Sequence, residues 1–270
     1  MSMKHLFALR AEGPPLIRRV AGVLGIGIVV MVWWLLTLGA TPESRVVSPV
    51  LLPSPGEVLR GIPTLFTERA LVASIAATLK RVFGGFLLAI AVGVPLGIIA
   101  GSYRMVDALT RPLSVFARNV PVAVLIPLTI LWFGIDETQK MMFIFIATVP
   151  FVFFDSVRAI ASVHDRYVET AQTLGASPSQ IVSKVLIALA LPDMFSGLRS
   201  LFGLAFGYIM LAELVNAEHG LGYLLMTSQR RGLTEHIFAI LILIGLLAYG
   251  IDRVLFWFQR GLFPYRADSE

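Results

Sequence analysis

The sequence contains no cysteine and few charged residues. The absence of cysteine excludes disulfide bonds and thiolate metal sites. Charged residues make up only 14% of the 270 positions, against about 25% in an average soluble domain. Hydrophobic residues make up 57%, and the mean hydropathy is +0.82. These values predict an all-α polytopic membrane protein with little mass outside the bilayer.

The sequence also lacks the motifs of an enzyme. No GxxxxGK[ST] phosphate-binding loop occurs, so we expect no ATPase in this chain. The four histidines are scattered without the spacing of metal ligands, and no catalytic triad or paired-carboxylate site is visible. We therefore predict no catalytic residue, no metal and no cofactor. The net charge of +5 fits cationic cytoplasmic loops, so nucleic-acid binding is not needed to explain it.

Six apolar segments approach the ~20 residues that a bilayer requires. They cover about residues 20–40, 71–100, 112–135, 141–160, 194–215 and 236–258. Residues 1–70 then hold an N-terminal segment, the first span and an outer polar segment. Residues 71–262 form the main transmembrane domain, and residues 263–270 form a short tail.

The distribution of basic residues predicts the orientation. Six spans place both termini on one side, and 14 of the 22 Lys and Arg residues fall on that side. Positive residues accumulate in cytoplasmic loops. We therefore expect both termini, and the connection between the fourth and fifth spans, to be cytoplasmic.

That connection, about residues 161–192, contains the most structured polar stretch of the chain. From Glu169 to Pro192 the sequence predicts a helix, a turn at Gly175 and a second helix. Ser177 is suited to cap the second helix, with Pro178 at its first position and a glutamine completing a capping box. Pro192 is expected to end it. An ordinary surface loop is the alternative interpretation.

The stretch resembles the EAA loop of the permease subunits of bacterial ABC importers. Glu169, Ala171 and Gly175 match that motif in register, whereas Thr170 replaces an alanine. The Leu-Pro pair of the motif is lost at its usual place, and Leu191–Pro192 supplies one four residues later. Five further segments resemble the nitrate/sulfonate/taurine permeases: LLPSPGEVL, the Lys-Arg…Gly-Phe run after residue 79, GVPLGIIAG, RNVPVAVLIPL…WFGI and AEL…GLGYL.

This resemblance implies a type I importer architecture in the bacterial inner membrane. The implied partners are a second permease copy, two cytoplasmic ATPase subunits that hold ATP and Mg²⁺, and a periplasmic substrate-binding protein. The EAA-like element would be the helix that couples the permease to the ATPase. We assign this role to Glu169, Thr170, Ala171, Leu174, Gly175, Ala176, Ser177 and Pro178.

Two further groups of residues are candidates for function. Arg118, Asn119, Pro121 and Pro127 fall in the third segment and could line an anion pathway. Snorkelling of Arg118 to the cytoplasmic surface is equally compatible with the sequence. Arg81 and Glu213 fall near the outer ends of two spans, where a structural ion pair is favoured over a substrate contact.

The sequence thus predicts a permease that imports a small anion of the sulfonate, taurine or nitrate type. Another solute, such as a vitamin precursor or an aromatic acid, is the alternative within the same class. An ion-coupled secondary transporter would need carboxylates at a midplane site and commonly repeated halves, and neither is visible.

Overall fold

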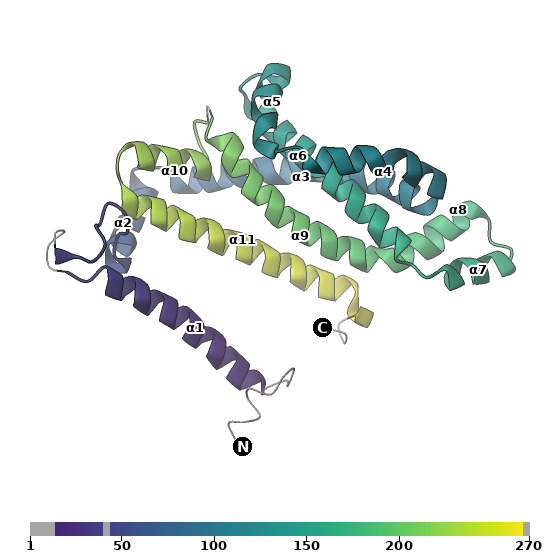
Figure 1. Cartoon of the computed structure of the whole chain (residues 1–270), viewed down its shortest axis with the longest axis horizontal. Coiled ribbons are helices and arrows are strands. Elements are labelled where there is room, and N and C mark those ends of the chain that lie inside the picture. Colours follow the sequence, from purple (N-terminus) through teal and green to yellow (C-terminus); the bar gives the residue numbers. More distant parts are fainter. Residues whose placement is uncertain (1–13, 40–43, 216, 267–270) are drawn as a thin grey trace. The chain divides into compact units, whose positions relative to one another are not determined.

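The computed structural model describes residues 14–39, 44–215 and 217–266, which form helices and turns with no strand among them (Figure 1). The α-helices are α1 (Pro15–Leu36), α2 (Pro55–Thr67), α3 (Leu71–Ser102), α4 (Arg104–Asn119), α5 (Leu125–Phe133), α6 (Glu137–Ala161), α7 (Asp165–Thr173), α8 (Pro178–Gln180), α9 (Ile187–Glu213), α10 (Leu221–Arg230) and α11 (Thr234–Leu262). A short 3-10 turn η3 (Val122–Val124) precedes α5, a π-helical segment η4 (Ile181–Leu186) joins α8 to α9, and a 3-10 turn η5 (Pro264–Arg266) follows α11. The predicted all-α class is confirmed.

Four helices of the described residues are long and apolar enough to cross a membrane. They are α3, α6, the continuous helix Pro178–Glu213 and α11. The arms Arg104–Asn119 and Val122–Phe133 count as a fifth only when taken together, because they meet at 85°. The first predicted segment corresponds to a shorter apolar helix, Val20–Leu36, within α1.

The third predicted span is wrong as a single straight helix. Val120 and Pro121 are extended, with ψ of 126° and 118°. Proline disfavours the helical conformation in the residue before it and cannot donate a backbone hydrogen bond. The N–H of Val120 donates to the carbonyl of Ala117 at 3.4 Å, which closes the end of α4, and the side-chain amide of Asn119 donates to the carbonyl of Val115 at 2.7 Å. Pro121 therefore marks a true break.

The prediction that Pro192 ends the second short helix is also wrong. Pro192 is buried inside α9, and the helix runs from Pro178 to Glu213. A proline costs a helix one hydrogen bond. Ending the helix in an apolar environment would leave several backbone groups without partners. Continuation of the helix is the less costly solution.

The chain divides into two compact units, described here separately. The first comprises residues 1–67 and 228–239, and the second comprises residues 68–227 and 240–270. In the first unit, the indole of Trp33 donates to the carbonyl of Pro53 at 2.8 Å. The hydroxyl of Thr64 lies 2.8 Å from Nε2 of His236. Arg45 makes two hydrogen bonds to Glu57, of 2.8 and 3.0 Å, which hold the pKa of that carboxyl down at about 2.

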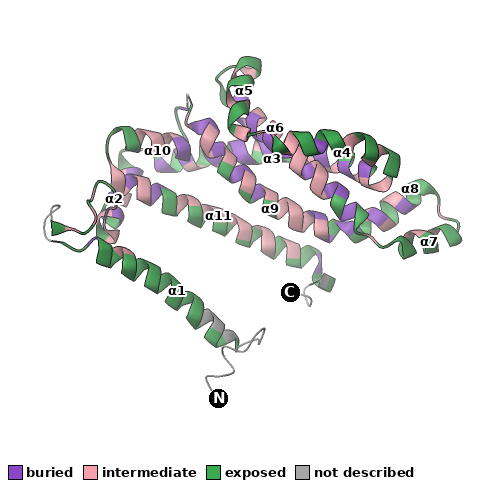
Figure 2. Ribbon diagram, viewed as in Figure 1, coloured by how far each residue is buried: buried purple, intermediate pink, exposed green. Residues whose placement is uncertain are grey.

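In the second unit, α3 and α6 form the closest helix pair. Glycines on α3 at four-residue spacing face α6, and a Cβ added at Gly97 would lie 2.5 Å from Cβ of Ser156. The same crowding occurs at Gly93 against Val152. Small residues let membrane helices approach closely, as the sequence predicted for this span. Figure 2 shows buried residues along α3, α6 and α9, whereas α1 is exposed along nearly its whole length.

Candidate functional site

The turn between α7 and α8 is closed by its own backbone. Gly175 has a φ of +78°, which an L-residue adopts only with strain. Its N–H donates to the carbonyl of Gln172 at 2.9 Å, and the N–H of Ala176 donates to the carbonyl of Ala171 at 2.9 Å. These two bonds form a Schellman motif, which satisfies the last carbonyls of α7. Ala171 and Gly175 of the predicted motif therefore occupy the positions at which a Schellman motif ends a helix.

The start of the next helix is equally fixed. The hydroxyl of Ser177 accepts a hydrogen bond from the N–H of Gln180 at 3.4 Å, and the Gln180 side chain accepts from the N–H of Ser177 at 2.8 Å. Pro178 occupies the first helical position. The predicted capping box is confirmed. The helix then continues through the π-helical segment η4 into α9 without a break.

The element from Asp165 to Leu186 is attached to the second unit through apolar contacts. Ile181 and Leu186 of η4 are buried against Ile160 of α6. Ala171 and Ala176, which flank the turn, pack against the same cluster. The residues on both sides of the Schellman turn are thus packed against the C-terminal end of α6.

The opposite side of the element is exposed and carries mixed chemistry. Leu174 is 82% exposed, and Glu169, Thr170, Ser177 and Pro178 are also exposed. The carboxylate of Glu169 makes no ion pair within residues 14–39, 44–215 and 217–266, although its backbone carbonyl accepts from Thr173 at 2.9 Å. An apolar side chain and a carboxylate on one rigid turn form a surface suited to a protein partner.

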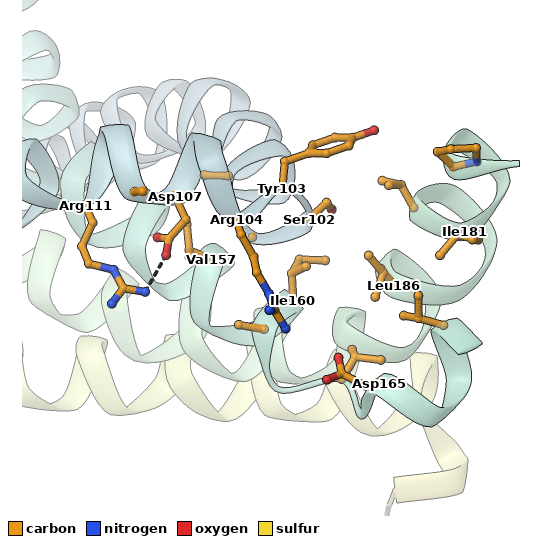
Figure 3. A pocket seen from close by; sticks show the side chains of 18 of the residues that line it. Ser102, Tyr103, Arg104, Asp107, Arg111, Val157, Ile160, Asp165, Ile181 and Leu186 are labelled. Atoms are coloured by element: carbon orange, nitrogen blue, oxygen red, sulfur yellow. Dashed lines mark hydrogen bonds and ion pairs between the residues drawn. The ribbon is translucent and has the colours of Figure 1, made fainter. Parts of the chain in front are cut away.

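A cavity of about 940 Å³ lies between this element and the corner that joins α3 to α4 (Figure 3). Val157 and Ile160 of α6 form one apolar wall of the cavity. Ile181 and Leu186 of η4 line the opposite side. Its polar rim is formed by Arg104, Asp107, Arg111 and Asp165, of which Arg111 and Asp107 pair at 2.5 Å. The element from Asp165 to Leu186 therefore has open space on the side of the α3–α4 corner.

At the other end of α9 a carboxylate is buried in a polar network. Glu213 is 1% exposed, and its Oε1 lies 2.8 Å from Nη1 of Arg81, which is 2% exposed. The hydroxyl of Thr78 donates to Glu213 at 2.8 Å, and the N–H of Gly222 donates to its Oε2 at 2.9 Å. Arg81 also makes two hydrogen bonds to Glu137 at the start of α6. The structure thus brings together Arg81 and Glu213, and it joins α3, α6, α9 and the start of α10 around them.

Sequence reasoning missed three members of this network, namely Thr78, Glu137 and the turn before α10. The signal in the sequence was the spacing of two glycines after Glu213. A Cβ at Gly220 would collide with the carboxylate of Glu213, and a Cβ at Gly222 would lie 2.7 Å from the carbonyl of Met210. Both positions need glycine because the turn is wrapped closely around the carboxylate.

Arg118 lies at the break between α4 and α5. Its guanidinium stacks on the ring of Phe154 of α6, with the carbon Cζ 3.5 Å from the ring centroid. Its Nε is buried without a hydrogen-bond partner in the described part of the chain. Asn119 is exposed, Pro121 forms the break, and Pro127 lies inside α5. The four predicted residues are therefore grouped around a bend and do not line one straight helix.

Long apolar helices joined by short connections, one of them an exposed helix–turn–helix, characterise a polytopic membrane protein. The chain belongs to the family of binding-protein-dependent transport system inner membrane components, whose family model matches residues 93–265. The resemblance to ABC importer permeases is thereby confirmed. The chain is a multi-pass membrane permease subunit, not an enzyme.

Its relatives include several transport proteins. The taurine transport system permease protein TauC of Escherichia coli is 30% identical over 95% of this chain and 94% of its own length. A probable ABC transporter permease protein of Brucella melitensis is 34% identical over 83% of this chain and 87% of its own length. A structure of the MetNI methionine ABC transporter in an inward-facing conformation matches with a TM-score of 0.64, at 23% identity over 74% of this chain and 97% of that chain. This last match shows the type I importer fold.

Proposed function

We propose that this chain forms the translocation path of an ATP-driven importer for a small anion of the taurine, sulfonate or nitrate type. The proposal is supported by the similarity to TauC and to a putative aliphatic sulfonates permease, SsuC of Bacillus subtilis, which is 29% identical over 83% of this chain. A bicarbonate permease of Synechococcus elongatus, 28% identical over 72% of this chain, keeps small inorganic anions among the candidates. A vitamin precursor or an aromatic acid is the alternative substrate.

The observation that carries the mechanism is the continuity of one helix. At ~1.5 Å per residue, the 36 residues from Pro178 to Glu213 span about 54 Å. One end is fixed to the coupling turn by the capping box, and the other end carries Glu213 in the network with Arg81. A displacement of the turn would therefore reach the far end of the membrane domain. A flexible loop in the same place would absorb it.

The proposed assembly contains two copies of this chain, two cytoplasmic ATPase subunits with ATP and Mg²⁺, and a periplasmic binding protein. Both termini and the turn at Gly175 lie in the cytoplasm. Leu174 would enter an apolar groove of the ATPase, and Glu169 would pair with a basic residue beside it. Closure of the ATPases on ATP would move the turns and open the path outward, and hydrolysis would reset it.

The coupling role is tested by a pair of matched glycines. Gly175 and Gly134 have φ of +78° and +77°, neither has a neighbour within 4 Å of an added Cβ, and each donates one backbone hydrogen bond. Proline fixes φ near −65° and removes the donor, so the local cost is the same at both sites. We expect Gly175→Pro to lose co-purification of the ATPase and substrate uptake in proteoliposomes, whereas Gly134→Pro retains the ATPase.

Two results would overturn this role. One is normal, ATP-dependent uptake by Gly175→Pro. The other is equal loss of the ATPase from both glycine variants, which would show that the turn has no special part in the contact. Circular dichroism and gel filtration of both variants verify that they are folded.

Substrate class is tested separately, in a strain that lacks this chain. Failure to grow with taurine as the only sulfur source, restored by the wild-type chain but not by Gly175→Pro, would support a sulfonate. Normal growth would exclude a sulfonate and direct the test to nitrate and bicarbonate.

Arg118→Gln should weaken uptake of an anion, and Arg118→Lys should retain part of that uptake because the charge remains. Unchanged uptake in Arg118→Gln would exclude the anion role of this guanidinium.

A further inference from the structure

Three arginines surround one aromatic ring near the C-terminal end of α11. The guanidinium carbons of Arg199, Arg253 and Arg260 lie 5.0, 5.4 and 5.7 Å from the centroid of Phe256. Arg199 comes from α9, whereas the other two arginines lie on α11 with Phe256 between them. All four residues belong to the second unit. A guanidinium within about 6 Å of a ring centroid is attracted to the ring, which holds these cations close together.

The charges in this cluster are not balanced. Arg199 pairs with Asp252, with Nε 2.8 Å from Oδ1, and donates to Gln259 at 3.0 Å. Gln259 in turn donates to the hydroxyl of Ser196 at 2.6 Å. Arg253 and Arg260 make no hydrogen bond or ion pair within the part of the chain that the structure describes. Two exposed guanidinium groups, seven residues apart on one side of a helix, therefore remain available for an anion.

The space between them has the shape and surroundings of a headgroup site. A cavity of about 390 Å³ is lined by Arg253, Val254, Phe256, Trp257 and Arg260. Trp257 is 71% exposed, and Val254 and Phe258 beside it are 54% and 51% exposed. At ~1.5 Å per residue, Arg260 and Arg253 lie about 3 and 14 Å from the end of α11 at Leu262. Basic and tryptophan side chains at this depth are typical of the interface between headgroups and acyl chains.

We propose that Arg253 and Arg260 bind the phosphate of an anionic phospholipid, with Phe256 as the floor of the site and Trp257 against the acyl chains. The recognised chemistry is a phosphate oxyanion that accepts from two guanidinium groups. The exposed apolar side chains around the cavity favour a lipid as its source, because a free phosphate gains nothing from them. Binding would fix the end of α11 beside α9, where Asp252 and Gln259 already hold Arg199.

The test uses the full-length chain in phosphatidylcholine vesicles and the fluorescence of Trp257. Phosphatidylglycerol with brominated acyl chains quenches tryptophan on contact, and brominated phosphatidylcholine is the reference lipid. The signal of Trp257 is obtained as the difference from the Trp257→Phe variant. We expect phosphatidylglycerol to quench Trp257 at a lower mole fraction than phosphatidylcholine. In Arg253→Gln/Arg260→Gln this preference should fall roughly tenfold or more, since each arginine near an anionic surface contributes about a factor of five.

The matched control is Arg230→Gln/Arg231→Gln, which removes the same charge from the end of α10 and the turn before α11, and should retain the preference. Arg260→Gln alone should give a preference for phosphatidylglycerol between those of the wild type and the double variant. This single variant replaces the double variant in the test if the double variant does not fold. Equal quenching by both lipids, or an unchanged preference in the double variant, would overturn the proposal. Loss of the preference on addition of 10 mM inorganic phosphate would also overturn it, because the site would then take free phosphate.

Discussion

The ion pair between Arg81 and Glu213 offers a quantitative test of how the end of α9 that lies away from the turn at Gly175 is held. Both side chains are buried, and the N–O distance is 2.8 Å. Coulomb's law with an effective dielectric constant of about 20 gives roughly 6 kcal/mol for unit charges at this distance. Desolvation of two ions offsets part of this energy. We therefore expect a coupling energy of about 2–4 kcal/mol between the two side chains.

The perturbation is a double-mutant cycle with Arg81→Met, Glu213→Gln and the combination. Arg81→Met leaves the carboxylate of Glu213 buried without a cation and should lower the free energy of unfolding by about 3–5 kcal/mol. Glu213→Gln leaves Arg81 paired with Glu137 alone, so the loss should be smaller. Glu213→Gln also turns an amide donor toward the hydroxyl of Thr78 or the N–H of Gly222. The double variant should lose 2–4 kcal/mol less than the sum of the single changes.

Arg45 and Glu57 form the control pair, because their closest N–O distance is likewise 2.8 Å, although they make two hydrogen bonds where Arg81 and Glu213 make one. Their side chains are 15% and 35% exposed, against 2% and 0% for Arg81 and Glu213. Exposed pairs are screened by water, so the coupling in this pair should be clearly smaller. Free energies of unfolding come from titration with a denaturing detergent, followed by circular dichroism.

Additive single changes at Arg81 and Glu213 would refute the reasoning, since they would show that the two charges do not interact. Equal coupling energies for both pairs would also refute it, because burial would then have no effect. A folded double variant with normal uptake would show that the network stabilises the protein without taking part in transport.

Three further predictions concern single positions. Gly222→Ala places a Cβ 2.7 Å from the carbonyl of Met210 and should lower the free energy of unfolding by about 1–3 kcal/mol; unchanged stability would show that the turn can relax. Ser177→Ala removes a helix cap and should cost about 1 kcal/mol, with Ser177→Thr close to wild type; equal loss in both would contradict the capping role. Because Arg45 lowers the pKa of Glu57 from 4.5 to about 2, the stability due to its ionised form is complete above about pH 4.5 and is lost as the pH falls towards 2. Thermal unfolding of Arg45→Gln should therefore depend less on pH in that range than unfolding of the wild type, and identical pH profiles would exclude the contribution.

The turn at Gly175 and the capping box at Ser177 could be predicted because their hydrogen bonds join residues three to five positions apart. A Schellman motif and a capping box each depend on a few consecutive residue types. Arg81 and Glu213 could be proposed as partners because an ion in the membrane needs one. Thr78 and Glu137 could not be added to them, since nothing in the sequence specifies which side chains of α3 and α6 face α9.

The prolines show why the boundaries of the spans were harder to predict. Pro121 and Pro192 look alike in the sequence, yet the first breaks a helix and the second does not. At the first break, Pro121 has no N–H to donate to the carbonyl of Ala117, and the N–H of Val120 donates to that carbonyl at 3.4 Å. Pro192 is buried, and the helix continues on both sides of it from Pro178 to Glu213. Residue type alone therefore does not specify which proline ends a helix, because the packing that holds the helix together on both sides of Pro192 cannot be seen in the sequence.

The continuity across Pro192 has a mechanical consequence. Had the helix ended there, the turn at Gly175 and the network at Glu213 would belong to separate bodies, and movement of one would not require movement of the other. Because Ile181 and Leu186 are packed on the end of α6 while Glu213 is tied through Arg81 to its start, α9 is attached to α6 at both ends. Displacement of the turn at Gly175 must then rotate the α6–α9 pair together or separate one of the two attachments. The attachment at Glu213 is an ion pair with Arg81, and Thr78 and Gly222 also donate hydrogen bonds to the carboxylate. The attachment at Ile181 and Leu186 is an apolar contact beside a cavity of about 940 Å³. Apolar contacts have no preferred direction and this one has open space beside it, so we expect movement to begin there.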